Sequence, residues 1–469
     1  MRTFIILFIF INFSIQAQIQ ENQVLSLEDC IRLAETNNID LKRSGIQSET
    51  EKLTFRSTKS RVLPDLNASY SYAVNKGRSI DPYTNDVIDQ QFSYSNAGIR
   101  LNAQLFNGFE LRNSIQRDRY NMQAAEAEKQ AARQQLVLDV TLAYFQILNA
   151  QDLLKLAKLR LESTRGQQDR ISSLAEEGSG NPADLSDIQG QFKNDEAAVL
   201  TAENQLQQAH LDLRLLLNIE TDFEIRELPL QPEMNSYELS AEELYQQSLE
   251  NLEVFEARKL RLEAAREDVA VARSLYVPEL SFFAQLNTNY SSLASLLNET
   301  GTQVVETGQF LNINGTTYAV QTNQSQFSQQ DIPYVDQLNN NLSSVAGLSF
   351  SIPIFNGFRA KRQVSLKKLQ LEDARLELEN TKNEYRRAIE AAYNDMDLAY
   401  QDYFLLQEQV KAYAESFRVN EIRFQNGVSN LVAYIISKNN LDRARVNMAN
   451  AKYEFLIRRQ VLDYYRGSY

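Results

Sequence analysis

The fold is decided by residues 109–177, and the centre of this stretch, at residues 136–161, reads LVLDVTLAYFQILNAQDLLKLAKLRL. The stretch contains no proline and one glycine, Gly166. Its apolar residues recur with alternating steps of four and three: Leu136, Val140, Ala143, Ile147, Ala150, Leu154, Ala157 and Leu161. This heptad spacing is typical of long helices that pack side by side. At ~1.5 Å per residue, a helix of this length extends roughly 100 Å.

A second stretch, residues 358–426, repeats the pattern and also lacks proline. The same steps of four and three occur at Ala392, Met396, Ala399, Tyr403, Leu406, Val410, Tyr413 and Phe417. We therefore expect two long helical rods, and we expect the other segments to connect, turn or receive them.

The composition favours long helices and disfavours one class of partner. The chain of 469 residues contains 8 prolines, 15 glycines and no tryptophan, and its long runs are rich in Ala, Glu, Gln, Leu and Arg. Its formal net charge is −13. Because DNA and RNA binding depends on positive charges that neutralise phosphates, we expect no nucleic-acid partner.

The first 17 residues have the pattern of a secretory signal peptide. Arg2 is followed by an apolar run from Phe4 to Ile11, and the small residue Ala17 precedes a polar one. An anchoring helix needs about 20 apolar residues, and this run is too short. Past Ala17 no apolar run could span a bilayer as a helix, so we expect the mature protein to be soluble or to cross a membrane only as a barrel.

The mature chain is predicted to begin with one repeat over residues 18–238. Its elements are a helix at 27–62, strands at 65–74 and 93–106, the long helix at 109–177, a helix at 183–217 and an irregular segment at 218–238. The strands are predicted from alternating apolar and polar residues. The turn after the long helix is predicted from glycines and from Asn181-Pro182, which can cap and start a helix.

A second repeat over residues 239–469 follows the same plan. Its elements are a helix at 240–275, strands at 280–290 and 344–355, the long helix at 358–426 and a helix at 431–466, with a polar loop predicted at 291–341. The helix starts match at an offset of 214 residues (239 − 25), and the Asn-Gly-Phe junctions match at 249 (356 − 107). These constant offsets indicate a tandem duplication.

The four strands pose a closure problem. Each has one apolar and one polar face. A membrane-spanning strand needs ~9–11 residues, and these segments are of that size. A membrane barrel needs about eight strands or more, so several chains would have to share one barrel. The alternative is a small soluble sheet packed on its own helices. In the barrel interpretation the lipid-facing residues include Leu66, Tyr70, Leu101, Leu280, Phe282 and Leu348.

The signal peptide, the duplicated plan, the two Asn-Gly-Phe junctions and the glycine turns together resemble the TolC family of outer-membrane efflux proteins. The resemblance implies a mainly α fold with a β-barrel part. It implies a homotrimer in the outer membrane, with four strands per chain in one barrel and a helical coiled-coil tube in the periplasm. It also implies a periplasmic adaptor and an inner-membrane pump as partners. One alternative is a coiled-coil structural protein of the envelope, which would not explain the amphipathic strands. The other is a periplasmic adaptor, which also has a long helical hairpin but whose compact β domains are missing here.

No catalytic constellation is visible, and we expect neither an enzyme nor a cofactor. His210 is the only histidine, so no multi-histidine metal site can form, and a packing or surface role is expected for it. Cys30 is the only cysteine and is expected to be a small buried residue. No phosphate-binding loop or serine nucleophile motif is present.

The candidate site residues lie at the turns. Asp184 and Asp187 share one helix face, and in a trimer they would form a ring of six like charges that attracts cations. The alternative is that these acids balance the helix dipole. This sequence departs from the best-known pattern of the family after the second turn. Acids that narrow the tube entrance follow that turn in the family pattern, whereas this chain has Ala433 and Ile436 there. The full set of periplasmic gate candidates is Asp184, Asp187, Glu176, Glu177, Arg423, Asn426 and Asn430.

Glycines and asparagines mark two further groups of candidates. The predicted adaptor-docking tips are Gly178, Gly180 and Gly427. The predicted strand-to-helix junctions are Asn107, Gly108, Asn356 and Gly357.

Overall fold

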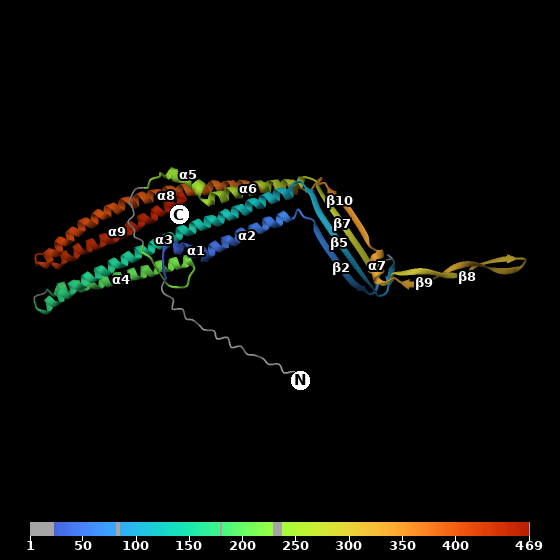
Figure 1. Ribbon diagram of the computed structural model, residues 1–469, viewed down its shortest axis with the longest axis horizontal. Coiled ribbons are helices and arrows are strands. Elements are labelled where there is room, and N and C mark those ends of the chain that lie inside the picture. The colour runs from blue at the N-terminus through green and yellow to red at the C-terminus, as the bar shows by residue number, and fades with distance from the viewer. Residues whose placement is uncertain (1–22, 81–84, 179–180, 228–236, 469) are drawn as a thin grey trace, which may run out of the picture. The chain divides into compact units, whose positions relative to one another are not determined.

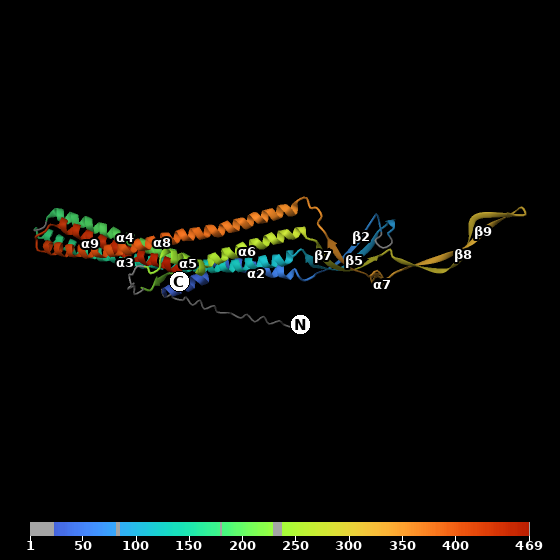
Figure 2. The ribbon, with the colours of Figure 1, turned by 90° about the horizontal axis from the view of Figure 1, so that it is seen from above.

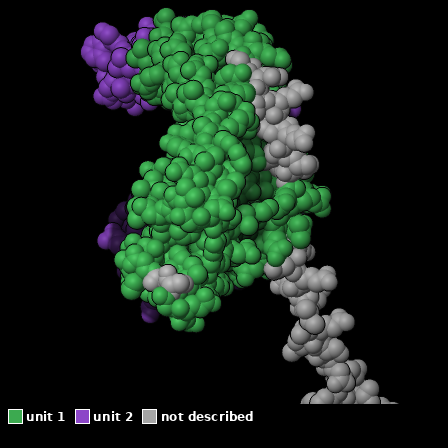
Figure 3. Space-filling model, turned by 90° about the vertical axis from the view of Figure 1, so that its left-hand side faces the viewer, with its two compact units in different colours: residues 1–52, 120–262, 373–469 green, residues 53–119, 263–372 purple. Residues whose placement is uncertain are grey.

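The computed structural model describes residues 23–80, 85–178, 181–227 and 237–468. The predicted signal peptide lies outside these ranges. The described chain is mainly helical, with a smaller share of strands (Figure 1). Among these residues, no helix combines the length and the apolar character that a membrane crossing requires. The chain divides into two compact units, residues 1–52, 120–262 and 373–469 and residues 53–119 and 263–372 (Figure 3).

Two helical hairpins dominate the first unit. Their helices are α3 (Glu110–Glu176), α4 (Pro182–Leu217), α8 (Arg359–Gln425) and α9 (Leu431–Arg466). The long helices α3 and α8 have 67 residues each and begin and end one residue inside the predicted bounds. Contacts such as Lys158 with Glu203 and Arg458 with Asp395 join the paired helices, which lie side by side in Figures 1 and 2.

Each hairpin turn is built from a helix-stopping glycine and a helix-starting asparagine. Gly178 and Gly427 take left-handed backbone angles, with φ of 75° and 70°, which glycine adopts without steric cost. The side chain of Asn181 then accepts from the Ala183 amide, and that of Asn430 accepts from the Ala433 amide. These caps satisfy donors at the starts of α4 and α9.

Two helices that the sequence predicted as continuous are each broken once. The predicted helix 27–62 is α1 (Leu27–Asn37) and α2 (Ile39–Ser60), and the predicted helix 240–275 is α5 (Ala241–Asn251), α6 (Glu253–Arg273) and a 3-10 turn, η1 (Ser274–Tyr276). The breaks fall at Asn38 and Leu252, whose ψ angles of 131° and 121° are not helical. Their offset, 252 − 38 = 214, equals that of the repeat, so the break was duplicated with the rest.

One strand of a short parallel pair lies in the segment predicted to be irregular, residues 218–238. Strand β1 (Gln23–Leu25) pairs with β6 (Phe223–Ile225). Tyr144 of α3 is fully buried beneath it and donates a hydrogen bond to the Arg226 carbonyl at 2.6 Å. Cys30 is also fully buried in this core, as expected, and burial raises the pKa of its thiol to about 12.

The second unit contains a four-stranded antiparallel sheet. Its strands are β2 (Asp65–Asn75), β5 (Phe92–Asn107), β7 (Glu279–Ser291) and β10 (Ser343–Ser351), in the order β10-β7-β5-β2. Strand β10 ends before its predicted bound of residue 355, because Pro353 has no amide hydrogen to donate to the sheet. A small hairpin, β3 (Arg78–Ile80) with β4 (Val87–Asp89), lies between β2 and β5 in the sequence.

The prediction of a polar loop at 291–341 is wrong, because most of this segment forms a long β-hairpin. Strands β8 (Ser295–Ile313) and β9 (Thr316–Asp331) pair in antiparallel fashion around Asn314-Gly315, both with positive φ. Asn-Gly is the preferred dipeptide for this turn, so the signal was present in the sequence. Helix α7 (Tyr334–Asn340) follows, and the Gln337 side chain bonds the Ser291 backbone.

Candidate functional site

The acidic gate candidates lie around the first hairpin turn. Glu176, Glu177 and Asp187 are exposed, and Asp184 is partly buried in the first turn of α4. The capping residue Asn181 places its amide nitrogen 3.4 Å from Asp184 Oδ1. In the single chain, Asp184 therefore occupies the position where the positive end of the α4 dipole favours a carboxylate.

The candidates at the second turn complete the ends of their own helices. The Asn426 side chain donates to the Ile422 carbonyl at 2.7 Å, and Asn430 caps α9. The Arg423 carbonyl accepts from the Val428 amide at 2.8 Å. Contacts of these residues with a neighbouring chain remain a prediction, and Gly180 lies outside the described residues.

An apolar cluster joins the two hairpins near their turns. We call it the tip cluster: Ile171 of α3, Ile188 of α4, and Leu431 and Tyr434 of α9. Tyr434 is 1 % exposed, and its ring stacks on Phe424 of α8 with 5.1 Å between ring centres. Burial raises the pKa of the Tyr434 hydroxyl to about 12. All four helices of the two hairpins thus share one small core next to the turns.

Farther along the hairpins lies a second connection, which the sequence reasoning missed. This buried charge network consists of Arg160 and Thr164 of α3, Gln191 and Asp195 of α4, and Lys438 and Asp442 of α9.

Asp195 is at the centre of the buried charge network and is fully buried. It accepts hydrogen bonds from Thr164 at 2.6 Å and from Gln191 at 2.7 Å. Arg160 Nε lies 2.7 Å from Asp195 Oδ1 but is not aimed for a hydrogen bond, so this contact is Coulombic. Lys438 Nζ donates to Asp442 at 2.9 Å and lies 3.6 Å from Asp195. Two acids and two bases balance, as a buried network requires.

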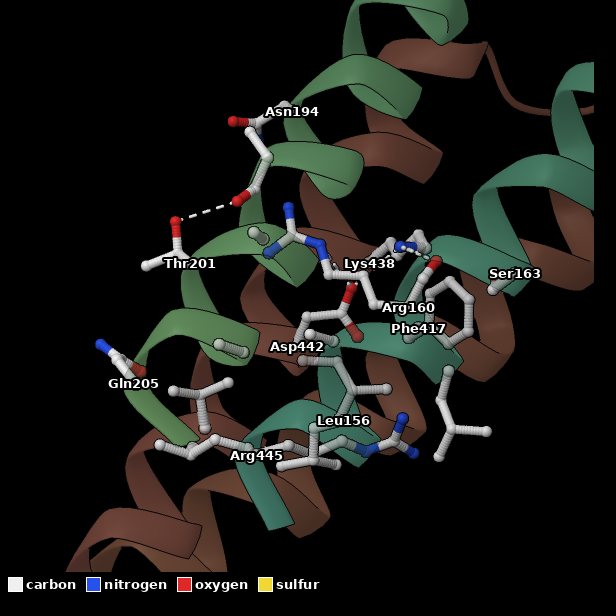
Figure 4. Close-up of a pocket in the computed structure, with 18 residues that line it drawn as sticks. Leu156, Arg160, Ser163, Asn194, Thr201, Gln205, Phe417, Lys438, Asp442 and Arg445 are labelled. Carbon is white, nitrogen blue, oxygen red and sulfur yellow. Dashed lines mark hydrogen bonds and ion pairs between the residues drawn. The ribbon is translucent and has the colours of Figure 1, made fainter. Parts of the chain in front are cut away.

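A cavity of ≈ 490 Å³ adjoins this network (Figure 4). Helices α3, α4 and α9 form its walls, and α8 contributes Phe417. Its lining includes the apolar residues Leu153, Leu156, Leu441 and Val446. Lys438 and Asp442 of the network line it as well, as does Arg445.

The strand-to-helix junctions have the same geometry in both repeats. The pairs Gly108-Phe109 and Gly357-Phe358 all have positive φ, between 60° and 66°. Phe109 meets the edge of Phe106 at 5.3 Å, and Phe358 meets Phe355 in the same way at 5.6 Å. Asn107 additionally donates to the Glu110 side chain at 2.7 Å.

The sheet exposes the side that the sequence predicted to face lipid. Leu66, Tyr70 and Leu348 are 64–66 % exposed in the single chain. The register places Leu66 opposite Leu101, and Ala346 opposite Ala284, on one face. Such a large apolar surface is unusual for a protein face in contact with water.

His210 has the packing role expected from the sequence. Its ring lies 5.3 Å from that of Phe223. Burial, and secondarily the charge of Arg214, lower the pKa of His210. Within the described ranges, no three His, Cys, Asp or Glu side chains gather as a metal site would require.

Comparisons with known proteins agree in family and in fold. The model of the family "Outer membrane efflux protein" matches residues 30–218 and 244–468, one match in each repeat. The outer membrane protein TolC of Escherichia coli (strain K12) is 22 % identical over 447 residues, covering 93 % of this chain and 81 % of TolC.

Two further proteins support this result. The probable outer membrane lipoprotein SilC of Salmonella typhimurium is 26 % identical over 265 residues, and that alignment spans 55 % of each protein. The crystal structure of the Campylobacter jejuni CmeC outer membrane channel superimposes with a TM-score of 0.73 at 17 % identity, covering 94 % of this chain and 85 % of CmeC. The fold is therefore that of a duplicated chain with helical hairpins and an amphipathic sheet.

Proposed function

Because this chain belongs to the outer membrane efflux protein family, we propose that it forms the outer-membrane duct of a tripartite export system. In this proposal an inner-membrane pump supplies the energy and a periplasmic adaptor connects the pump to the duct. The role proposed for the chain is conduction, which requires no bond to be made or broken.

The observation that carries the proposal is the four-stranded sheet. Its outer strands β10 and β2 each lack a partner on one side within the described chain, and its apolar face is exposed. Unpaired strand edges and apolar surface are both unfavourable in a single chain. Three copies that pair β10 of one chain with β2 of the next would close a twelve-stranded barrel and place the apolar face against lipid.

Aromatic residues at both ends of the sheet support a membrane position. Near the end where β5 begins, the Tyr334 hydroxyl lies 3.0 Å from Ser95 and 3.3 Å from Tyr70. At the end where β5 leads into α3, Phe106 packs on Phe109. Membrane barrels carry aromatic girdles at both interfaces, with an apolar band between them.

The helical hairpins would line the periplasmic part of the duct. We propose that it opens when α3 and α4 separate from α8 and α9 near the turns, a movement that disrupts the tip cluster. In this proposal Asp184 and Asp187 of three chains surround the opening, and the turns at Gly178 and Gly427 meet the adaptor. A ring of carboxylates selects cations at such a constriction.

Mass and conductance together test this function. The purified protein in a mild nonionic detergent should have the mass of a trimer by light scattering, and it should form ion-conducting pores in planar bilayers. A monomer with intact secondary structure contradicts the shared barrel. A trimer without conductance instead favours a structural protein of the envelope.

A further inference from the structure

Small side chains line part of the cavity beside the buried charge network (Figure 4). On α4 it is lined by Ala197, Ala198 and Ala202, and on α3 by Ala157. Alanine fills little of the space between helices, so these positions produce a hollow where larger side chains would pack. The leucines and the valine described above make much of the remaining wall apolar.

The cavity also carries one uncompensated positive charge. Asp195 and Asp442 balance Arg160 and Lys438 within the network. Arg445 is an additional lining residue, is exposed, and forms no ion pair within the part of the chain that the structure describes. This local excess contrasts with the net charge of −13 for the whole chain.

We propose that this cavity binds an amphiphilic anion, a molecule with one carboxylate or sulfate group and an aliphatic tail. Arg445 pairs with the anionic group. The tail lies against the leucines. A cavity of ≈ 490 Å³ is within the range of roughly 300–1,000 Å³ that small-molecule sites have.

The site joins helices from both hairpins, and this has a measurable consequence. A ligand held between α3, α4 and α9 binds the folded arrangement and not the separated helices. It therefore raises the stability of that arrangement in proportion to its occupancy. Occupancy can thus be followed by binding and by thermal unfolding.

Octanoate is a suitable probe, with 1-octanol as the analogue that lacks the charge and acetate as the analogue that lacks the tail. Titration calorimetry on the trimer in phosphatidylcholine nanodiscs, with empty nanodiscs subtracted, should show one saturable octanoate site per chain and a higher unfolding temperature. Octanol and acetate should each bind at least about tenfold more weakly than octanoate. Because no flux is measured, the result does not depend on whether the protein conducts.

Three variants locate the site. Arg445→Ala removes the charge and Ala198→Leu fills the hollow, and each should weaken octanoate binding about tenfold. Arg443→Ala removes an exposed arginine of α9 that does not line the cavity and should leave binding unchanged. Light scattering verifies that each variant is still a trimer.

Two results overturn the proposal. One is the absence of saturable octanoate binding to the parent protein. The other is equal binding by the parent and by either Arg445→Ala or Ala198→Leu, since the anion or the tail then lies elsewhere.

Discussion

Asp195 of α4 and Lys438 of α9 lie 3.6 Å apart, and their exposed fractions are 0 % and 4 %. They belong to different hairpins, so a charge pair in the interior connects the two repeats of the chain. Burying ions costs several kcal/mol each, and only good partners offset this cost. Neutralising one partner should therefore be far more harmful than neutralising both.

Asp195→Asn leaves the buried Lys438 and the half-buried Arg160 with one acid and is expected to lower the free energy of unfolding by about 3–5 kcal/mol. The double variant Asp195→Asn with Lys438→Met restores the charge balance and should recover part of that loss. Urea unfolding followed by circular dichroism measures both. Equal stability of the single variant and the parent would show that the pair contributes nothing.

Leu101→Arg places a charge on the apolar face of β5. If Leu101 lies near the middle of the bilayer, the change should cost roughly 2–4 kcal/mol and reduce the heat-stable trimer on a gel. Asn102→Arg is the matched control, because its side chain lies on the opposite face of the same strand. Equal losses in the two variants would contradict the assigned orientation of the sheet.

Asp184→Asn combined with Asp187→Asn tests the acidic ring. The trimer should remain intact, and single-channel recordings should show a lower preference for cations. Divalent cations added on the periplasmic side should block the parent channel more than the variant, because carboxylates are hard oxygen ligands. Unchanged selectivity and block would assign Asp184 and Asp187 to helix capping.

Gly108→Ala and Gly357→Ala compare two glycines with the same backbone and different surroundings. Both have positive φ, 64° and 60°, which costs an alanine about 1–2 kcal/mol. A Cβ at Gly108 would lie 2.6 Å from Cβ of Val277, whereas a Cβ at Gly357 has nothing within 4 Å. Overpacking should add about 1–3 kcal/mol at Gly108 only. The heat stability of the two variant trimers measures this difference. Equal stability would show that an alanine at position 108 is not crowded by Val277.

His210 gives a pH dependence that a single substitution removes. Its pKa is lowered, so the unfolded chain binds the proton more tightly than the folded chain. The stability should therefore decrease as the pH falls below about 6.5, the ordinary value for histidine, toward the lowered folded pKa. His210→Gln should show a smaller decrease between pH 7 and 5.5. Identical profiles would mean that His210 titrates as an exposed residue.

Periodicity predicted the long elements because each repeats one physical requirement many times. The heptads of α3 and α8 and the alternation in β2 and β5 are spread over whole segments, and no bound of these elements differs by more than one residue. The hairpin β8–β9 has no such alternation, since both of its faces are exposed. Only the Asn314-Gly315 dipeptide indicated it.

The buried charge network could not be predicted from the sequence for a different reason. Its members come from three helices, and no sequence rule brings Asp195 to Lys438 across 243 residues (438 − 195). The spacing of Lys438 and Asp442 was visible as an ordinary helix pair. Their burial follows from how the two hairpins pack, which heptad patterns do not specify.

The sequence of the β8–β9 hairpin should make it resistant to proteases that cut after basic residues. Between Arg273 and Arg359 the chain contains no lysine and no arginine, so enzymes that cut after basic residues find no site there. Exposed segments are otherwise the preferred places for such cuts. If the duct stands in the outer membrane with this hairpin outside, a trypsin-like enzyme in the surroundings can bind the hairpin without cleaving it. Trypsin added to whole cells should accordingly leave residues 274–359 uncut.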